Sequence, residues 1–357
     1  MGGGGASYPG SGTVPTVRNW LVAADDRTGA FEVAGLLATV IGPVMVTVGA
    51  APAGSGVVDL GSRALAADEA VVLAEAVEQQ PSAWAAHKID STLRGHWAGE
   101  LLARQAVSGR RLVVLPGWPA LGRTCVDGLV RVRGEPVARP GDSLPGADLL
   151  TSVAALREWL SGDCLIAVCD VPDSETMHAL AGALVATDVL IAGPGGPLGA
   201  AFAAHVHALG TAARSQAAPS PVIGGSIGVI LGSAAGVSHE QLRRLVSVRP
   251  EVVVMATSAS EGELRPEVAM VLAERASRWI LDAQPDTIIV IGGDTAAALL
   301  GDAPRLVGGC AAPGMPWSRD EAGGGPLVVT KAGGFGGPDA LVDLVCGETV
   351  PMQDRAT

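Results

Sequence analysis

From residue 17 onward, short apolar runs alternate with longer stretches in which apolar side chains recur at helical spacing. Apolar runs of this kind are typical of strands buried on both faces of a sheet, and they occupy residues 20–24, 44–48, 57–60, 84–89 and 111–115. Helical spacing follows the first run at Ala30, Val33, Ala34, Leu37, Val40 and Ile41, and recurs at 67–79 and 97–107. This alternation predicts a mainly parallel sheet covered by helices.

Residues 117–148 interrupt the alternation. The segment is rich in Gly, Pro, Arg and Asp and contains a short β-like run at 129–132. It predicts a hairpin that projects from the sheet. The α/β pattern then resumes with strands at 165–168 and 189–192 and a helix at 198–209.

A second α/β unit follows the segment Ala-Ala-Pro-Ser-Pro at 217–221, whose composition is typical of a linker. Its predicted strands lie at 227–231, 252–255, 288–291 and 327–330. A chain of 357 residues is long enough for two domains. We therefore predict an α/β fold with domains at 17–216 and 222–357, each a mainly parallel sheet flanked by helices, and an active site in the cleft between them. Residues 1–16 lack the features of a signal peptide and predict a disordered leader.

Composition narrows the classes of function. The net charge of −12 and the absence of a basic run argue against nucleic-acid binding. No uninterrupted apolar stretch is long enough to predict a membrane span, so we expect a cytoplasmic protein without membrane contact. The five cysteines have no zinc-site spacing, and we predict no metal centre built from protein side chains alone.

Polar side chains are unusually dense after the strand at 84–89. Lys88, Asp90, Ser91, Thr92 and Arg94 precede Gly95 within eight residues. These groups suit a small oxygenated anion, and the planar fork of Arg94 matches a carboxylate. The alternative is a salt-bridge cluster at a loop tip.

Asp25 and Asp26 follow the first predicted strand, and ligands bind at the carboxyl ends of strands in open parallel sheets. The two carboxylates could bind hydroxyl groups, act as a base or hold Mg²⁺ through water. The alternative interpretation is that they cap the following helix.

Glycine-rich turns follow three predicted strands of the second unit. They contain Gly232-Ser233, Gly292-Gly293-Asp294-Thr295, and residues 331–337 with Lys331, Gly333 and Gly336. Backbone N–H groups in such turns can face a phosphate, which favours a nucleotide site. A single glycine pair would indicate only a tight turn. P-loop and protein-kinase signatures are absent from the sequence. The glycine-proline segment at 193–199 has the wrong spacing for a dinucleotide loop and predicts a structural turn.

In order along the chain, these motifs resemble the four-carbon acid sugar kinase family, once grouped as a domain of unknown function (DUF1537). The resemblance rests on residues 24–30, the full signature at 88–95, Gly122-Arg123-Thr124, Asp127-Gly128 and the three glycine-rich turns. Members phosphorylate small sugar acids such as threonate, erythronate and 3-oxo-tetronate with ATP.

The resemblance implies that 17–216 binds the sugar acid, that 222–357 binds ATP, and that Mg²⁺ assists the transfer. It implies catalytic roles for Lys88 and for Asp26 or Asp90 as the base. Sugar-acid contacts are implied for Asp25, Ser91, Thr92, Arg94 and Arg123. ATP contacts are implied for Ser233, Gly292, Gly293, Asp294, Thr295, Lys331, Gly333 and Gly336.

Three positions depart from the pattern of the family: Arg27, where many members are apolar; Glu32, which is often Asp; and Ala235, which is often Ser. These departures concern the substrate more than the reaction. The alternatives are a kinase of another small hydroxy acid in specialised metabolism, and a non-catalytic sugar-acid sensor. The sequence leaves homo-oligomerisation open.

Overall fold

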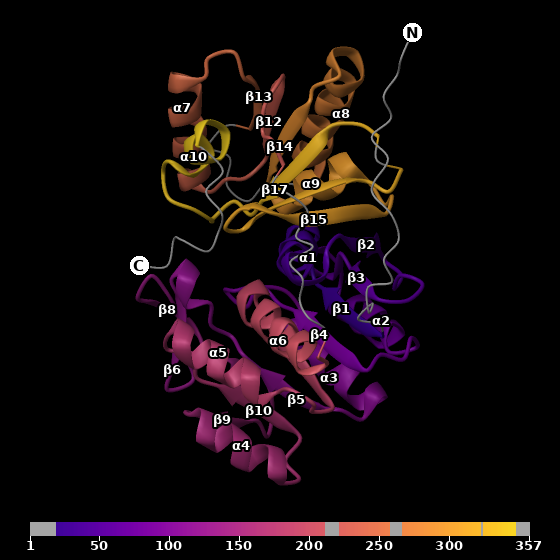
Figure 1. Cartoon of the computed structure of the whole chain (residues 1–357), viewed down its shortest axis with the longest axis vertical. Helices are drawn as coiled ribbons and strands as arrows, with labels where there is room; N and C mark the ends of the chain where they lie inside the picture. The colour runs from indigo at the N-terminus through magenta and orange to yellow at the C-terminus, as the bar shows by residue number, and fades with distance from the viewer. Residues whose placement is uncertain (1–18, 211–220, 258–265, 323, 348–357) are drawn as a thin grey trace.

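The computed structural model describes residues 19–210, 221–257, 266–322 and 324–347. These residues form two halves stacked along the long axis of the molecule, as Figure 1 shows. The predicted leader at 1–16 and residues 217–220 of the predicted linker lie outside the described residues. The domain boundaries 17–216 and 222–357 therefore stay predictions.

The N-terminal half contains a parallel sheet in the order β2-β3-β1-β4-β11-β5-β10-β9. The strands are β1 (Trp20–Ala24), β2 (Val44–Val48), β3 (Gly56–Asp59), β4 (Trp84–Lys88), β5 (Arg111–Val114), β9 (Asp148–Leu150), β10 (Ile166–Cys169) and β11 (Val189–Gly193). The runs predicted at 20–24, 44–48, 57–60, 84–89, 111–115, 165–168 and 189–192 are confirmed as strands, with ends that differ by a residue at most.

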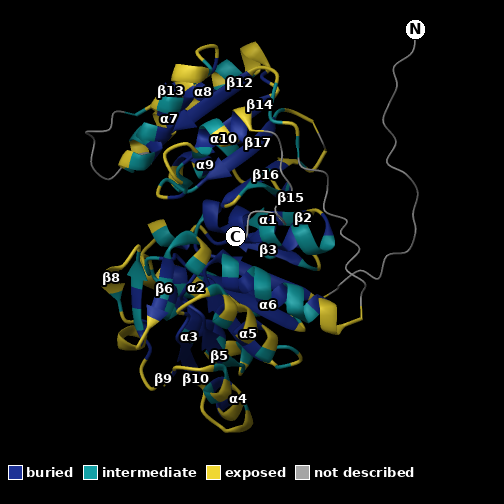
Figure 2. Ribbon diagram, turned by 60° about the vertical axis from the view of Figure 1, so that its left-hand side comes forward, coloured by how far each residue is buried: buried dark blue, intermediate teal, exposed yellow. Residues whose placement is uncertain are grey.

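Helices cover both faces of this sheet. One face carries α1 (Arg27–Ile41), α4 (Val153–Ser161), α5 (Ser174–Ala183) and α6 (Gly195–Ala208), and the other carries α2 (Ala67–Val77) and α3 (Trp97–Ser108). Side chains of β1 alternate between the two cores, with Trp20 and Val22 on the first face and Leu21 and Ala23 on the second. Figure 2 shows the strands buried between helices whose outer surfaces are exposed.

The predicted projecting hairpin is confirmed as a separate antiparallel sheet of β6 (Arg123–Val126), β7 (Leu129–Val132) and β8 (Glu135–Ala138). Short 3₁₀ helices precede and follow it, η2 (Pro119–Leu121) and η3 (Pro140–Ser143), and a third, η1 (Ser62–Ala64), follows β3. The glycine-proline segment is confirmed as a strand-to-helix turn, since β11 ends at Gly193 and α6 begins at Gly195.

The C-terminal half contains the parallel strands β13 (Val253–Ala256), β12 (Ile227–Leu231), β14 (Thr287–Ile291) and β17 (Leu327–Lys331), in that order. Helices α7 (Gly236–Val248) and α10 (Ala340–Cys346) cover one face, and α8 (Pro266–Ala283) and α9 (Gly293–Leu300) cover the other. In the parts of the chain that the structure describes, no helix combines the length and apolar character that a membrane span requires.

An antiparallel pair that the sequence did not predict joins the two halves. β17 pairs with β16 (Met315–Asp320), β16 with β15 (Arg305–Ala312), and β15 with β2 of the N-terminal half. All the main strands therefore belong to one 14-stranded sheet. Figure 1 shows β15 lying beside α1 at the junction.

Candidate active site

Three neighbouring strands deliver the first group of polar side chains. β1 lies between β3 and β4 in the sheet, and all three are parallel. Asp25 and Asp26 follow β1, Arg63 follows β3, and Asp90 follows β4. The carboxyl ends of the strands therefore place three carboxylates around one guanidinium, as expected for the ligand-binding edge of an open parallel sheet.

Asp25, Asp26 and Asp90 surround Arg63, and we call these four residues the acid cluster. Arg63 Nη2 donates to both carboxylate oxygens of Asp25, at 2.8 and 2.7 Å, and Arg63 Nη1 donates to Asp26 Oδ2 at 3.0 Å. The same Nη1 lies 3.7 Å from Asp90 Oδ1. The sequence interpretation missed Arg63, although it follows a strand exit just as Asp25 does, and that position was the available signal.

The three carboxyls have different proton affinities. Burial raises the pKa of Asp25 to about 7, even though Arg63 and Lys88 act against it. Burial also disfavours ionised Asp26, but the charges of Arg63 and Lys88 outweigh burial and lower its pKa. Burial opposes ionised Asp90 as well, yet hydrogen bonds from Arg94 and the charge of Arg63 hold its pKa well below its ordinary value. Asp26 and Asp90 are therefore ionised at neutral pH, whereas Asp25 titrates near neutrality.

Asp26 has the capping role that was considered for it from the sequence. It is the N-cap of α1, where its Oδ1 accepts a hydrogen bond from Gly29 N at 2.8 Å. Its Oδ2 accepts from Thr28 Oγ1 at 2.7 Å and from Arg63 at 3.0 Å. The capping interpretation is thus confirmed, and one oxygen remains directed at the cluster.

Lys88 is buried beside the cluster, with its Nζ 3.5 Å from Glu32 Oε1 and donating to Ile89 O at 3.0 Å. Burial opposes the protonated amine, but Glu32, Asp25 and Asp26 raise its pKa, so the amine stays charged. Burial raises the pKa of Glu32. Glu32 also accepts a hydrogen bond from Gly195 N at 3.2 Å, which fixes the turn before α6 behind the lysine.

Arg94 lies at the rim of the cluster. Its guanidinium pairs with Asp90 through Nη2–Oδ1 at 2.7 Å and Nε–Oδ2 at 3.0 Å, and its side chain is 68% exposed. Asp90 also accepts from the backbone N of Thr92 at 3.0 Å and from the Thr92 hydroxyl. Ser91 is buried in the same turn. The planar guanidinium of Arg94 therefore binds a carboxylate of the protein in this structure.

The three glycine-rich turns gather in the C-terminal half, because β12, β14 and β17 are neighbours. A Cβ atom on Gly232 would lie 1.8 Å from Thr295 Oγ1, and one on Gly333 would lie 1.9 Å from Ser233 Oγ. Gly292 has φ +112°, a conformation that favours glycine. The turns pack closely and form a backbone surface, which we call the glycine surface. Helix α9 begins at this surface. Thr295 Oγ1 is buried there and has no hydrogen-bond partner among the described residues.

Lys331 is a buried residue that stabilises the glycine surface through hydrogen bonds. Its Nζ donates to Ser238 Oγ at 3.2 Å, Ala332 O at 3.1 Å and Gly333 O at 3.3 Å. Burial lowers its pKa to about 7. Gly336, with φ +84°, lies in the same loop, where Gln241 Nε2 donates to Phe335 O at 3.0 Å. The loop at 331–337 is thus anchored to α7.

The two groups of residues meet at the start of α9. A Cβ atom on Gly293 would lie 2.9 Å from Asp26 Oδ2 and 3.4 Å from Thr28 Oγ1. Asp294 lies beside them with part of its surface exposed, and partial desolvation of its carboxyl together with the charge of Asp26 raises its pKa. The acid cluster and the glycine surface therefore form one site at the junction of the two halves.

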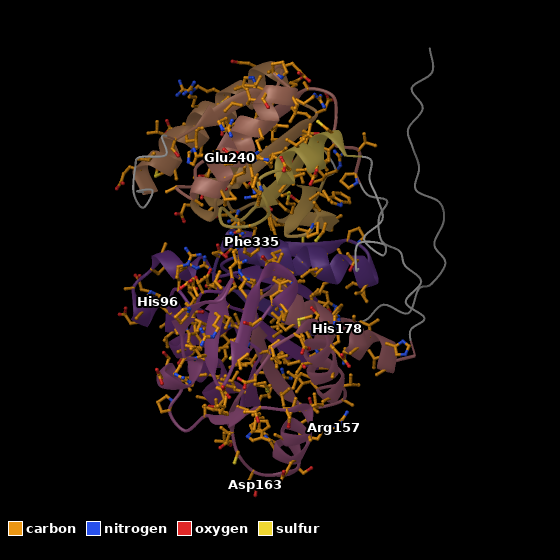
Figure 3. The ribbon with its side chains drawn as sticks, turned by 90° about the vertical axis from the view of Figure 1, so that its left-hand side faces the viewer. His96, Arg157, Asp163, His178, Glu240 and Phe335 are labelled. Carbon is orange, nitrogen blue, oxygen red and sulfur yellow. The ribbon has the colours of Figure 1, made fainter. Side chains whose placement is uncertain are left out.

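Arg123 and Phe335 cross the same junction. The Arg123 guanidinium lies 4.9 Å from the centroid of the Phe335 ring, and Trp118 packs edge-on against that ring at 6.3 Å. Figure 3 shows Phe335 at the boundary between the halves. Arg123 is buried, donates to Leu121 O, and leaves its Nε without a partner among the described residues. Sequence reasoning did not identify Phe335.

The residues present fit a nucleotide better than a protein-bound metal. In the described parts of the chain, no group of three or more His, Cys, Asp or Glu side chains could hold a metal ion. At the glycine surface, by contrast, the N–H groups of Gly293 and Gly333 and the buried Thr295 hydroxyl have no hydrogen-bond partner among the described residues, and N–H groups at such a turn can face a phosphate. A magnesium ion held mainly by phosphate oxygens would need only one or two carboxylates, such as Asp294.

Two domain families match the chain. A sugar-binding N-terminal domain matches residues 20–143, and a nucleotide-binding C-terminal domain matches residues 249–341. The first match contains the acid cluster, and the second contains the glycine-rich turns at 292–295 and 331–337 but not Gly232-Ser233.

Two curated relatives are similar over most of their length. A D-threonate kinase of Cupriavidus necator is 32% identical, and the match covers 85% of this chain and 82% of the relative. A D-threonate kinase of Bordetella bronchiseptica is 27% identical, over 78% of this chain and 82% of the relative.

Two solved structures share the fold. A Haemophilus influenzae protein of the DUF1537 family has a TM-score of 0.65 at 18% identity, over 92% of this chain and 100% of that chain. A Salmonella typhimurium protein described as a putative tRNA synthase has a TM-score of 0.69 at 20% identity, over 90% and 98%. At these identities the likeness shows the fold alone.

Proposed function

The chain belongs to the four-carbon acid sugar kinase family, and from that premise we propose that it uses ATP and Mg²⁺ to phosphorylate a hydroxyl of a small sugar acid. The observation that carries the proposal is the approach of Gly293 to Asp26. It brings the start of α9, a helix N-terminus of the kind that binds phosphate, against a carboxylate of the sugar-binding half. Phosphoryl transfer depends mainly on positioning and charge stabilisation, and this junction can supply both.

In the nucleotide half, the phosphates of ATP would lie on the glycine surface. Backbone N–H groups at Gly293 and Gly333 would face phosphate oxygens, and Ser233 and Thr295 would contribute hydroxyls. Gly292 would shape the turn, because its own N–H donates to Lys331 O at 3.0 Å and its φ is +112°. Lys331 would stabilise the loop at 331–337 through its hydrogen bond to Gly333 O, and the positive φ of Gly336 would allow the loop to turn. Asp294 fits as a carboxylate for Mg²⁺, which supplies charge neutralisation to the phosphates.

In the sugar-binding half, Lys88, which is buried, and Arg63, which is partly buried, would supply positive charge for the substrate carboxylate. Asp25, Ser91 and Thr92 would bind hydroxyl groups, and Arg123 would reach the junction from the projecting sheet. Arg94 would contribute only if the substrate displaced it from Asp90, since its fork is paired there.

Asp26 is the better candidate for the base. Its pKa is low enough for ionisation at neutral pH, and one of its oxygens lies beside the start of α9. Asp90 is committed to Thr92 and Arg94, which makes it a structural carboxylate.

D-threonate is the first substrate to test, because both curated relatives are D-threonate kinases. The enzyme would act in sugar-acid metabolism in the cytoplasm. The alternative of another small hydroxy acid remains within the same chemistry. A sensor without catalysis is disfavoured by the close packing of all three glycine turns.

The test is a coupled ADP-release assay with Mg·ATP across C3 to C6 sugar acids, including D-threonate and its stereoisomers. We expect turnover with at least one four-carbon acid and its loss in Asp26→Asn. Thermal shift with Mg·ATP and with each acid serves as a binding control. A protein stabilised by an acid but never by Mg·ATP would instead be a sensor. The mass of the wild-type protein in solution, measured by light scattering, would establish its oligomeric state.

A further inference from the structure

Arg27, the first residue of α1, is buried at the junction and reaches from one half to the other. Its Nε donates to Asp59 Oδ2 at 2.6 Å, within the N-terminal half. Its Nη1 donates to Gly301 O at 2.7 Å, in the C-terminal half. Its Nη2 lies 3.9 Å from Asp302 Oδ1, whose side chain is 90% exposed.

These contacts mean that consecutive residues hold both ends of one helix. Asp26 and Thr28 lie against Gly293 at the start of α9, and Arg27 binds the carbonyl of Gly301, its C-cap. A helix of eight residues is about 12 Å long, which an arginine side chain and two short side chains can span together. A cation at the carboxyl end of a helix also interacts favourably with the exposed carbonyls.

We propose that Arg27 is a positioning residue that fixes α9 against the acid cluster, and so sets where the phosphates lie relative to Asp26. This inference rests on the proposed function and deepens it. Arg27 acts through α9 rather than by touching either substrate. Asp59 holds the guanidinium in place, and is itself fixed by Gly61 N, which donates to its Oδ1 at 3.0 Å.

Removing Arg27 alone would leave Asp59 buried without its partner, which is strongly destabilising for reasons unrelated to α9. The informative variant is therefore Arg27→Leu combined with Asp59→Asn. It removes both charges and the Gly301 contact together. Asp59→Asn alone is the matched control, because it retains Arg27, its bond to Gly301 and an amide oxygen that can still accept from Arg27 Nε. It therefore reports the loss of stability from unpairing the buried charges without loss of the Gly301 contact. Asp302→Asn is a second control, since an exposed pair at 3.9 Å contributes little.

Two measurements on the full chain test the proposal. In the steady state with Mg·ATP and D-threonate, we expect kcat to fall about ten- to a hundredfold in the double variant. The Kd of D-threonate should stay within about twofold, because the acid cluster is intact. In native-state hydrogen exchange, amides of α9 should exchange faster in the double variant, while those of α7 should not change. Asp302→Asn should resemble the wild type, whereas Asp59→Asn should lower the overall stability but leave the exchange of α9 relative to α7 unchanged.

The possible outcomes distinguish a failure of the role inferred for Arg27 from a failure of the proposed kinase function. A folded double variant with wild-type kcat and wild-type exchange in α9 would overturn the role of Arg27. Faster exchange throughout the protein would do the same, because it would indicate a general loss of stability. If wild type turns over none of the acids, the proposed function fails, and exchange in α9 still decides whether Arg27 holds the helix.

Discussion

Arg63 carries the charge balance of the acid cluster, since its guanidinium contacts Asp25 and Asp26 and approaches Asp90. A lysine would keep the charge but could not bind two carboxylates in one plane. For Arg63→Lys we expect kcat/KM for the sugar acid to fall about a hundred- to a thousandfold, with little change in the Kd of Mg·ATP. Arg157→Lys, at an exposed position far from Phe335 in Figure 3, is the control. Similar kinetics in the two variants would remove Arg63 from the site.

Asp25 makes the stability of the folded protein decrease as the pH rises. Its pKa is raised from 3.8 to about 7 in the folded protein, mainly by burial. Between these values the folded state holds a proton that the unfolded state has released, so the contribution of Asp25 is full below 3.8 and is lost as pH rises through about 7. We expect the Tm of the wild type to fall relative to that of Asp25→Asn between pH 5 and 8. Parallel Tm curves would contradict the raised pKa.

The family resemblance implied that Asp25, Asp26, Lys88 and Asp90 belong to one sugar-acid site, and the structure brings them together because strand ends in a parallel sheet share one edge. The sequence could not predict how the charges pair. Asp90 and Arg94 are four residues apart in one turn, which lets Arg94 close on Asp90 before any ligand is considered. Charge pairing depends on side-chain directions in space, and no motif spacing encodes them.

At the scale of elements, α9 is one of the contacts between the halves, and its residue Gly293 approaches Asp26 closely. An added methyl group would lie 2.9 Å from Asp26 Oδ2, so Gly293→Ala must displace either the helix or the carboxylate. We expect kcat to fall at least about tenfold, alongside weaker Mg·ATP binding by calorimetry. Gly334→Ala, where a Cβ meets no atom within 4 Å, is the control. Equal kinetics for the two variants would show that the approach has no functional consequence.

Elements with strong periodicity were predicted to within a few residues, as with β12 at Ile227–Leu231. β15 and β16 were missed for a physical reason. Gly308 and Gly309 break the alternation of β15, the register shifts between Val307 and Gly309, and Pro316 lies within β16. A Cβ on Gly308 would lie 2.1 Å from the Trp317 ring, so the glycine is required by packing against the neighbouring strand. Such a requirement cannot be read from a local pattern.

The whole molecule is held together across its junction by several contacts of different kinds. Residues Arg305–Val307 pair with Val44–Val46, Arg27 binds Gly301, and Phe335 packs on Trp118. A strand ladder resists hinge motion more than a flexible linker would. We expect small-angle scattering to give the same radius of gyration for the free protein, each binary complex and the ternary complex. Compaction in the ternary complex alone would instead show closure by bending of the sheet.

The continuous sheet also has a consequence for synthesis on the ribosome. β2 is an edge strand of the N-terminal half until β15, more than 250 residues later, is made and pairs with it. During that interval Val44–Val48, a β-branched and largely apolar strand, presents unpaired backbone groups. Until its own β15 is made, a nascent chain can pair through this edge with the β15 of a neighbouring copy. β2 thus joins the two halves in the finished molecule but is an exposed edge strand during synthesis. The rate at which the C-terminal half is completed governs how long the backbone groups of β2 stay unpaired.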